Sequence, residues 1–498
     1  MNTDPIRKVV IVGGGTAGWI SAALLVKMLG KSVQICLVES EDIGIVGVGE
    51  ATIPPIIHFN EGLGLDERAF LRETMGTIKL GIQFENWGQQ GDSYMHAFGS
   101  FGKDFPFCSF HHFWLKAKAE GLSENFWDFS LNFQAAKANK FSKLERIAQA
   151  NLPGLVYAYH FDAALYAKFL RRSSEAMGVC RIEGKIEQVH VCEQSGFVQS
   201  VQLANGQQIA GDLFIDCSGM HSLLIEKTLN TGYEDWSHWL PCDRALAVPT
   251  EAVKPIVPYT RSIAHKAGWQ WRIPLQHRTG NGLVYASNYL SDDEAQARLL
   301  QKLDAPTLAE PRLIRFRTGR RLKQWHKNVV SIGLSSGFLE PLESTSIHLI
   351  QSGVIRLVNS FPHQGIKQVE VDEYNRQSQI EFEHIRDFII LHYKLTKRTD
   401  SKFWRDCRRM DIPERLARKM ALFEASGKVY REQDELFTPI AWVQVMLGQG
   451  MLPADFHPMA NALSPAQLQE LMDSLSTIYQ GSLQPLPLHD VFIQQFIR

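Results

Sequence analysis

The sequence predicts an α/β protein with a doubly wound, Rossmann-like module, a β-sheet module interleaved with it, and a mainly helical C-terminal cap. Three observations support this fold class. A β-branched run at residues 8–12 leads into a glycine-rich turn, strand-like segments recur between residues 186 and 290, and helical periodicity dominates after residue 372. We expect residues 1–375 to hold the two interleaved modules and residues 376–498 to form the cap.

Composition sets broad limits on function. The chain has 498 residues, 45% of them hydrophobic, and a formal net charge of −1, so its charge calls for neither nucleic acid nor an anionic membrane as a partner. Its seven cysteines include no C-x-x-C pair and suggest neither a disulfide framework nor a metal site. No apolar run approaches ~18 residues and no signal-peptide pattern is visible. We therefore expect a cytoplasmic protein, as a monomer or homodimer.

The first strand-helix-strand unit carries a dinucleotide-binding fingerprint, GGGTAG at residues 13–18. In this G-x-G-x-x-G pattern Gly13 allows a tight turn, Gly15 lets the backbone approach a pyrophosphate, and Gly18 brings helix and strand together. Glu39, at the end of the second strand, can accept hydrogen bonds from a ribose diol. Because all four features agree in spacing, we prefer a bound dinucleotide to a glycine-rich turn without a ligand.

The loop at residues 44–54, GIVGVGEATIP, bears on which dinucleotide is bound. Three further glycines follow the acidic residue directly, which suits an extended flavin buried lengthwise. An ordinary glycine-rich surface loop is the alternative.

A second strand-loop-helix unit spans residues 328–353. Its strand covers residues 328–332, and its helix is expected from Thr345 onward. The free N–H groups and the dipole at that helix start would favour a small anion. The carboxylate of Glu343 lies at the same place, so capping of the helix by Glu343 or Ser344 is an equally good interpretation.

Five residues between positions 79 and 112 are candidates for a site, but none of them is decisive by itself. Lys79 stands among mostly apolar neighbours, and on sequence alone we interpret it as a surface lysine whose stem packs on the protein. His96 and Phe98 would share one face of a strand, for which core packing is the simpler explanation. The adjacent His111 and His112 lack metal-ligand spacing and are expected to be structural.

The remaining elements follow in order. An amphipathic helix is expected within residues 155–178, and Asn205-Gly206 predicts a hairpin. The expected strands are residues 186–191, 198–203, 208–217, 269–274 and 282–287, and the expected C-terminal helices are residues 373–393, 413–425, 440–447 and 464–479.

The chain resembles the flavin-dependent halogenases of the tryptophan or indole type. Four features carry the resemblance: the glycine turn, Lys79, W-x-W-x-I-P at residues 269–274 and E-S-T at residues 343–345. The resemblance extends from residue 13 into the helical C-terminal part. The signature is highly specific for that family, where it is taken to exclude hydroxylation of the substrate by the flavin. It consists here of Trp269, Trp271, Ile273 and Pro274.

The resemblance implies a fold of the flavoprotein hydroxylase type with FAD as cofactor. It also implies that a separate flavin reductase supplies the reduced FAD by diffusion, and that oxygen and chloride or bromide are co-substrates, as in an oxidoreductase of the monooxygenase class. The residues expected at the FAD are Gly13, Gly15, Thr16, Ala17, Gly18, Glu39, Gly49, Ala51, Val189, Leu334 and Ile347.

By the same resemblance, the reaction is halogenation of an indole or other electron-rich aromatic. Halide would bind near Thr345 and Ser346, and hypohalous acid would travel to Lys79. Glu343 would stabilise positive charge on the ring or remove its proton. His96 and Phe98 would line the substrate.

Two features leave alternatives open. Ser346 stands where the family usually has glycine, which leaves open the size and affinity of the halide. The residues that would hold an amino acid head group cannot be placed, so tryptophan, free indole and a larger indole compound are all candidate substrates. An aromatic monooxygenase is the alternative enzyme, although Leu334 stands where such hydroxylases carry an acidic residue. A non-catalytic redox-sensing flavoprotein would need neither Lys79 nor Glu343.

Overall fold

The computed structural model describes residues 5–42 and 50–498, and its contacts group the chain into two compact units. Each unit is assembled from three separate stretches of chain. The first comprises Met1–Gly76, Phe161–Asp243 and Arg315–Glu383, and the second comprises Thr77–His160, Arg244–Ile314 and His384–Arg498. The predicted boundary at residue 375 stays a prediction.

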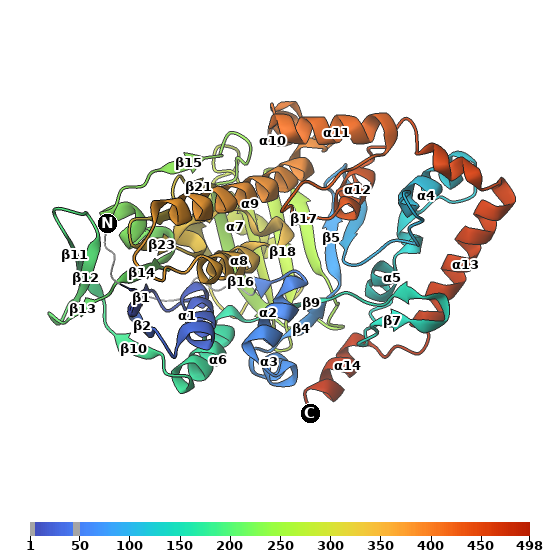
Figure 1. Ribbon diagram of the computed structural model, residues 1–498. Coiled ribbons are helices and arrows are strands. Elements are labelled where there is room, and N and C mark those ends of the chain that lie inside the picture. Colours follow the sequence, from blue (N-terminus) through green and yellow to red (C-terminus); the bar gives the residue numbers. More distant parts are fainter. Residues whose placement is uncertain (1–4, 43–49) are drawn as a thin grey trace. The chain divides into compact units, whose positions relative to one another are not determined.

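A six-stranded sheet forms the centre of the first unit (Figure 1). Four neighbouring pairs are parallel and only the edge strand β22 is antiparallel. Parallel strands are normally buried on both faces, and the β1 sequence KVVIV is apolar throughout its buried part. In spatial order the strands are β10 (Cys180–Glu183), β2 (Gln34–Glu39), β1 (Lys8–Val12), β14 (Leu213–Asp216), β23 (Val329–Ser331) and β22 (Trp325–His326).

Helices and small sheets complete this unit. Helix α1 (Thr16–Leu29) packs against α6 (Ala163–Ala176) and α8 (Ser346–Asn359). An antiparallel ribbon packs its apolar side chains on those of β1 and β2. The ribbon is β11 (Ile186–Val191), β12 (Val198–Leu203) and β13 (Gln208–Ala210); the other elements are β3 (Glu50–Ala51), α2 (Pro55–Leu63), α3 (Glu67–Glu73), β15 (Tyr233–Asp235), β21 (Gly319–Arg321) and β24 (Gly337–Phe338).

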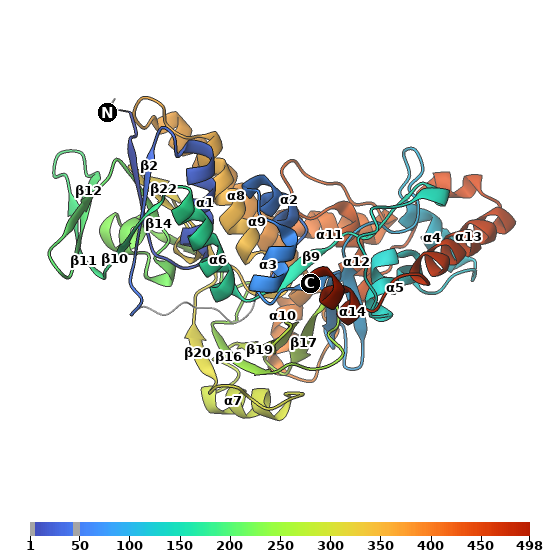
Figure 2. The same ribbon diagram turned by 90° about the horizontal axis from the view of Figure 1, so that it is seen from below.

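The second unit is built on a seven-stranded sheet in which β17 and β5 form a parallel pair. Helix α7 (Asp292–Gln301) packs on β16 and β19 (Figure 2). In spatial order the strands are β20 (Arg312–Arg315), β16 (Arg244–Glu251), β19 (Arg278–Tyr285), β18 (Gly268–Pro274), β17 (Thr260–His265), β5 (Gly81–Glu85) and β6 (Ser93–Ala97).

Short strands and helices surround this sheet. Strand β4 pairs antiparallel with β9, and β7 pairs with β8. The long helix α9 begins in the first unit and ends in the second. These elements are β4 (Thr77–Lys79), β7 (Arg146–Ile147), β8 (Leu152–Pro153), β9 (Ala158–Phe161), α4 (Phe110–Ala119), α5 (Leu131–Lys137), α9 (Gln368–Lys394), α10 (Lys402–Arg409), α11 (Glu414–Ser426), α12 (Pro439–Gly448), α13 (Pro465–Leu483) and α14 (His489–Phe496).

The helix expected within residues 155–178 is confirmed as α6. It begins at Ala163, because Asp162 caps it by accepting hydrogen bonds from two backbone N–H groups of the first turn. One predicted element needs correction. The strand expected at residues 208–217 is two strands. They are separated at Gly211 and Asp212, where the Asp212 carboxylate accepts backbone hydrogen bonds from Arg7 and Lys8.

All seven cysteines are free thiols. Within residues 5–42 and 50–498, every helix is too short or too polar to cross a lipid bilayer.

Candidate active site

The glycine turn between β1 and α1 has the shape that a dinucleotide needs. Gly13 has φ +111°, and a Cβ added there would lie 2.3 Å from the carbonyl oxygen of Cys217. A Cβ on Gly18 would lie 1.9 Å from the carbonyl oxygen of Gly13. Gly15 differs, because a Cβ added to it would meet no atom within 4 Å. Gly13 and Gly18 are therefore required by the fold, whereas Gly15 leaves space for a ligand.

The start of α1 is equally suited to a phosphate. Its N-cap is Gly15, no side chain caps it, and its first turn carries no acidic residue. The first N–H groups of a helix lack intrahelical partners, and the dipole there favours an anion. Thr16 donates its hydroxyl at 3.5 Å to the carbonyl oxygen of Ala163, so that side chain is directed to α6. The residues present therefore fit the pyrophosphate of FAD.

Glu39 lies beside the same turn and has partners that the sequence did not reveal. Arg181 on β10 donates a hydrogen bond at 2.5 Å to Glu39 Oε1, and Arg171 lies 3.6 Å from the same atom. A Cβ on Gly14 would lie 1.5 Å from Glu39 Oε2, so Gly14 makes room for this carboxylate. A carboxylate has about four acceptor sites, which leaves capacity for ribose hydroxyls.

Other residues expected at the FAD lie on different elements of the first unit. A Cβ on Gly333, which precedes Leu334, would lie 2.8 Å from Ala17 Cβ, so the structure brings α1 and the residues after β23 together. Ile347 is buried in the first turn of α8. Val189 packs with the apolar residues between the ribbon and the sheet, Ala51 is buried on β3, and Gly49 lies outside the described residues.

Glu343 sits before α8 and does not act as its N-cap residue. It ends a short 3₁₀ turn, Ser344 adopts a left-handed conformation with φ 60°, and Thr345 is the N-cap without a side-chain cap bond. The alternative interpretation, in which Glu343 or Ser344 is the N-cap residue of this helix, is therefore wrong. The side chain of Glu343 is only 1% exposed. Taking a carboxylate out of water is costly, so its burial requires a structural or chemical reason.

Lys79 ends β4 in the second unit and is 0% exposed, which overturns its interpretation as a surface lysine. Its ammonium lies 5.4 Å from the centroid of the Phe98 ring, a cation–π distance. Burial and the charge of Lys79 lower the pKa of His160, which faces the same strand. The structure therefore places a buried ammonium against an aromatic surface.

His96 and Phe98 share a face as expected, with ring centroids 6.5 Å apart. Sequence reasoning missed the rings around them. Phe388 lies 5.6 Å and Phe437 lies 6.1 Å from His96, and these two phenyl rings stack at 3.8 Å. Both come from chain segments about 300 residues further on, and no local pattern marks either of them. The result is an aromatic wall beside Lys79 and Phe98.

The backbone between His96 and Phe98 is held from α12. Gln444 accepts a hydrogen bond from the Ala97 N–H at 2.8 Å and donates one to the Ala97 carbonyl at 3.1 Å. Two bonds from one buried amide fix both position and direction of this backbone. Gln444 thereby orients the two aromatic residues that flank Ala97.

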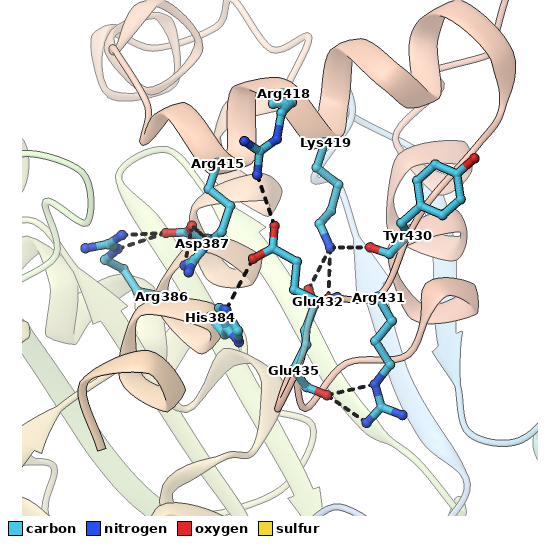
Figure 3. A network of polar contacts seen from close by, with 10 residues as sticks. All are labelled: His384, Arg386, Asp387, Arg415, Arg418, Lys419, Tyr430, Arg431, Glu432 and Glu435. Carbon is cyan, nitrogen blue, oxygen red and sulfur yellow. Dashed lines mark hydrogen bonds and ion pairs between the residues drawn. The ribbon is translucent and has the colours of Figure 1, made fainter. Parts of the chain in front are cut away.

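Buried ion pairs order the segment that carries Phe437 (Figure 3). Lys419 donates hydrogen bonds to both carboxylate oxygens of Glu435, at 2.8 and 2.9 Å. Asp387 on α9 accepts hydrogen bonds from two guanidinium groups at 2.7 to 2.9 Å. Because Glu435 lies two residues before Phe437, its fixed position limits the movement of that ring.

The signature strand presents its tryptophans together. Trp269 and Trp271 lie on β18 with ring centroids 6.2 Å apart, and Ile273 follows on the same face. Gly282 is the register partner of Trp271 on β19, and a Cβ there would lie 2.0 Å from the indole ring. Only glycine leaves room for that ring. Pro274 ends the strand, and its carbonyl oxygen accepts a hydrogen bond from Thr77 on β4.

Comparisons with known proteins identify the family. Residues 8–465 match the family described as tryptophan halogenase. The chain is 32% identical to tryptophan 7-halogenase RebH of Lentzea aerocolonigenes, over 98% of this chain and 99% of RebH.

Two solved structures of flavin-dependent halogenases are more similar in sequence. Xcc4156 from Xanthomonas campestris is 49% identical with a TM-score of 0.96, covering 99% of this chain and 98% of its own. BrvH from Brevundimonas sp. BAL3 is 45% identical with a TM-score of 0.95, covering 99% of both chains. These matches confirm the α/β fold class and the enzyme class, and they exclude the hydroxylase alternative. The chain belongs to the tryptophan halogenase family of flavin-dependent halogenases.

Proposed function

We propose that this enzyme halogenates an indole or another electron-rich aromatic compound, using FAD, oxygen and chloride or bromide, with Lys79 as the group that receives hypohalous acid. The single observation that carries this assignment is the complete burial of the Lys79 ammonium against Phe98. Removing an ammonium from water costs several kcal/mol unless its site compensates. An electrophilic halogenation needs a positioned N–H donor beside the ring, and a buried ammonium against an aromatic surface supplies one.

Bound FAD in its reduced form supplies the oxidising equivalents by reacting with oxygen. The chain's own groups would hold it at the uncapped start of α1, with Gly15 next to the pyrophosphate and Glu39 on the ribose. Among the described residues, we find one fingerprint of this kind, so we propose that NADH is used by a separate flavin reductase and reduced FAD arrives by diffusion.

For the halide we propose the start of α8. Thr345 is its N-cap, Ser346 its first residue, and the Leu349 N–H is the first to bond back, to the Thr345 carbonyl. The N–H groups before Leu349 are therefore the donors that remain for an anion. With Ser346 in place of the family's usual glycine, a Cβ and a hydroxyl enter this turn, and we propose that they alter the relative affinity for chloride and bromide.

Lys79 and Glu343 take the two chemical roles. Lys79 would donate a hydrogen bond to hypohalous acid or, after its ammonium loses a proton, form a haloamine with release of water, and so present an electrophilic halogen to the ring. Formation of the carbon–halogen bond leaves a positive charge and one extra proton on the ring. The Glu343 carboxylate would stabilise that charge or take that proton, which restores the aromatic system.

The substrate class follows from the aromatic wall. Phe98, His96, Phe437 and Phe388 offer flat apolar surfaces that suit an indole. RebH is a tryptophan 7-halogenase, whereas Xcc4156 and BrvH, which have higher identity, are described only as flavin-dependent halogenases. We therefore propose that the substrate is an indole compound. A panel of tryptophan, free indole and a larger indole compound tests which one it is.

The test is an assay of the purified protein with FAD, a flavin reductase, NADH and oxygen, with chloride or bromide, over that indole panel. We expect products whose mass increases by one halogen minus one hydrogen, and only when halide is present. Without the reductase, the protein should not oxidise NADH stoichiometrically. Hydroxylated products, or products that form equally without halide, would overturn the proposed function.

A further inference from the structure

Three buried polar side chains, those of Thr77 on β4, His160 on β9 and Thr260 on β17, form a chain of hydrogen bonds with a defined direction. The Thr77 hydroxyl lies 2.7 Å from the carbonyl oxygen of Pro274 and 3.1 Å from His160 Nδ1, and His160 Nε2 lies 2.9 Å from the Thr260 hydroxyl. A carbonyl can only accept, so Thr77 donates to Pro274 and accepts from Nδ1–H of His160. His160 Nε2 then accepts from Thr260. Each member of the chain has one defined role.

The backbone on either side of Lys79 is held as well. The N–H of Ile78 donates to Nε2 of His489 at 3.1 Å, and the N–H of Leu80 donates to the carbonyl oxygen of Pro258 at 2.7 Å. His489 donates in turn through Nδ1 to the carbonyl oxygen of Ile256 at 2.8 Å. Lys79 therefore stands between two fixed peptide groups.

Strand geometry links the side chains of Thr77 and Lys79. Residues two apart on a strand point to the same face, so a shift or rotation of Thr77 moves the start of the Lys79 side chain too. In the β4–β9 register, Thr77 is opposite His160 and Lys79 is opposite Ala158. The hydrogen-bonded pair of Thr77 and His160 thus lies one side-chain position along the same face from the pair of Lys79 and Ala158.

We infer that Thr77 and His160 are positioning residues for Lys79, and that the Pro274 carbonyl fastens the W-x-W-x-I-P strand to the lysine strand through Thr77. This inference rests on the proposed role of Lys79. Pro274, the last residue of the signature, then has a second role, because its carbonyl determines where β4 lies relative to β18.

Physical chemistry explains why such a lysine needs support. The ammonium ends a flexible four-carbon stem, and a misplacement of about 1 Å in a reacting group can cost about 100-fold in rate. His160 is suited to a position near Lys79 because its pKa is lowered. The main cause is burial, and the charge of Lys79 adds to it. His160 stays neutral near neutral pH, so no second positive charge arises beside the ammonium.

The test compares Thr77→Val with Thr77→Ser. Valine keeps the size of threonine but removes both hydrogen bonds, whereas serine keeps the hydroxyl. We expect the yield of halogenated product per reduced flavin oxidised to fall about 10-fold in Thr77→Val, mainly through kcat, and to return to at least half the wild-type yield in Thr77→Ser. The substrate KM and the FAD affinity should change little.

Thr74→Val is the matched control. Thr74 is equally buried, and its hydroxyl donates to the carbonyl of Phe70 in the preceding helix α3. It should lose comparable thermal stability and keep the wild-type yield per flavin oxidised. If Thr77→Val does not fold, Thr260→Val removes the far end of the chain without altering β4, and a yield decreased at least threefold is then expected.

Two failures are distinguishable. An active Lys79→Ala enzyme would overturn the proposed function of Lys79 itself. An inactive Lys79→Ala enzyme, together with a Thr77→Val enzyme whose product yield equals that of Thr74→Val, would overturn the positioning role alone.

Discussion

The glycine turn of the first unit and the lysine strand of the second unit differ in how far their determinants lie apart in the chain. Every part of the turn, from β1 through Gly13, Gly15 and Gly18 to Glu39, falls within residues 8–39. The surroundings of Lys79 come from β9, β17, the end of β18 and the last helix, α14. A local motif can be interpreted from spacing, whereas a site assembled from distant segments requires the fold.

The comparison also separates two ways in which a residue is constrained. Gly13 and Gly18 are required because a larger side chain would collide with neighbouring backbone, whether or not a ligand is bound. Lys79 is held by hydrogen bonds around its backbone while its charge stays buried. The first arrangement serves the fold, and the second is characteristic of a group that takes part in chemistry. The predictions below test that division, beginning with the largest effect.

Lys79→Ala should lower halogenation by more than two decades, because a buried ammonium in a closed site is worth several kcal/mol to the step it serves. Product formation is measured by mass spectrometry with reductase, FAD and halide present. Oxidation of reduced flavin should remain largely intact. A folded variant that keeps more than about a tenth of wild-type halogenation would contradict the catalytic role of Lys79.

Glu343→Gln should lower halogenation roughly 100-fold, since a charge-assisted contact in a water-poor site is worth about 3 kcal/mol. The thermal midpoint and FAD binding are measured in parallel and should be unchanged, because glutamine keeps the size and one acceptor. The double variant with Lys79→Ala should lose much less halogenation rate than the product of the two single losses. Full independence of the two losses, or an unimpaired Glu343→Gln enzyme, would remove Glu343 from the mechanism.

Gly15→Ala should weaken FAD binding about 10-fold, or ~1.4 kcal/mol, because its methyl group enters the space left for the pyrophosphate. Fluorescence titration measures the affinity for FAD. The thermal unfolding midpoint of the FAD-free protein should not change. Gly13→Ala is the contrasting variant, since its Cβ would meet the Cys217 carbonyl and the FAD-free protein should be destabilised. Equal behaviour of the two variants would contradict the division between ligand space and fold.

His265→Gln should have the smallest effect on halogenation, within about threefold at neutral pH, although its ring is also poorly solvated. Burial lowers the pKa of His265 from 6.5 to about 4. Between these values the unfolded chain binds a proton that the folded chain does not, so this residue makes stability fall as pH decreases from about 6.5 to about 4. Denaturant unfolding across that window should show a shallower decline in the variant. An unchanged slope would show that His265 titrates normally in the folded protein.

Much of the fold was predictable because its signals are local. The KVVIV strand, the ribbon strands at 186–191 and 198–203, and the helices after residue 372 follow from periodicity and turn residues. Helix α6 also follows from its amphipathic pattern, and Asp162 caps its start. The single strand expected at 208–217 failed because its break depends on hydrogen bonds from the distant Arg7 and Lys8 to Asp212.

The site was less predictable for the same physical reason. Arg181 pairs with Glu39 only because β10 lies beside β2, and Phe437 reaches His96 only because the C-terminal helices fold back on β6. Burial of Lys79 contradicts the usual tendency of lysines to keep their charge in water. Such exceptions to local rules concentrate where a protein performs chemistry.

Single-turnover kinetics of Lys79→Ala and Gly15→Ala, with flavin oxidation followed by absorbance and product by mass spectrometry in the same sample, test the central claim most directly. The account predicts that Lys79→Ala oxidises reduced flavin at a near-normal rate with almost no halogenated product. It predicts that Gly15→Ala, supplied with excess reduced FAD, retains the wild-type yield of product per flavin oxidised. A wild-type yield from Lys79→Ala would contradict the assignment of halogen transfer to the buried lysine.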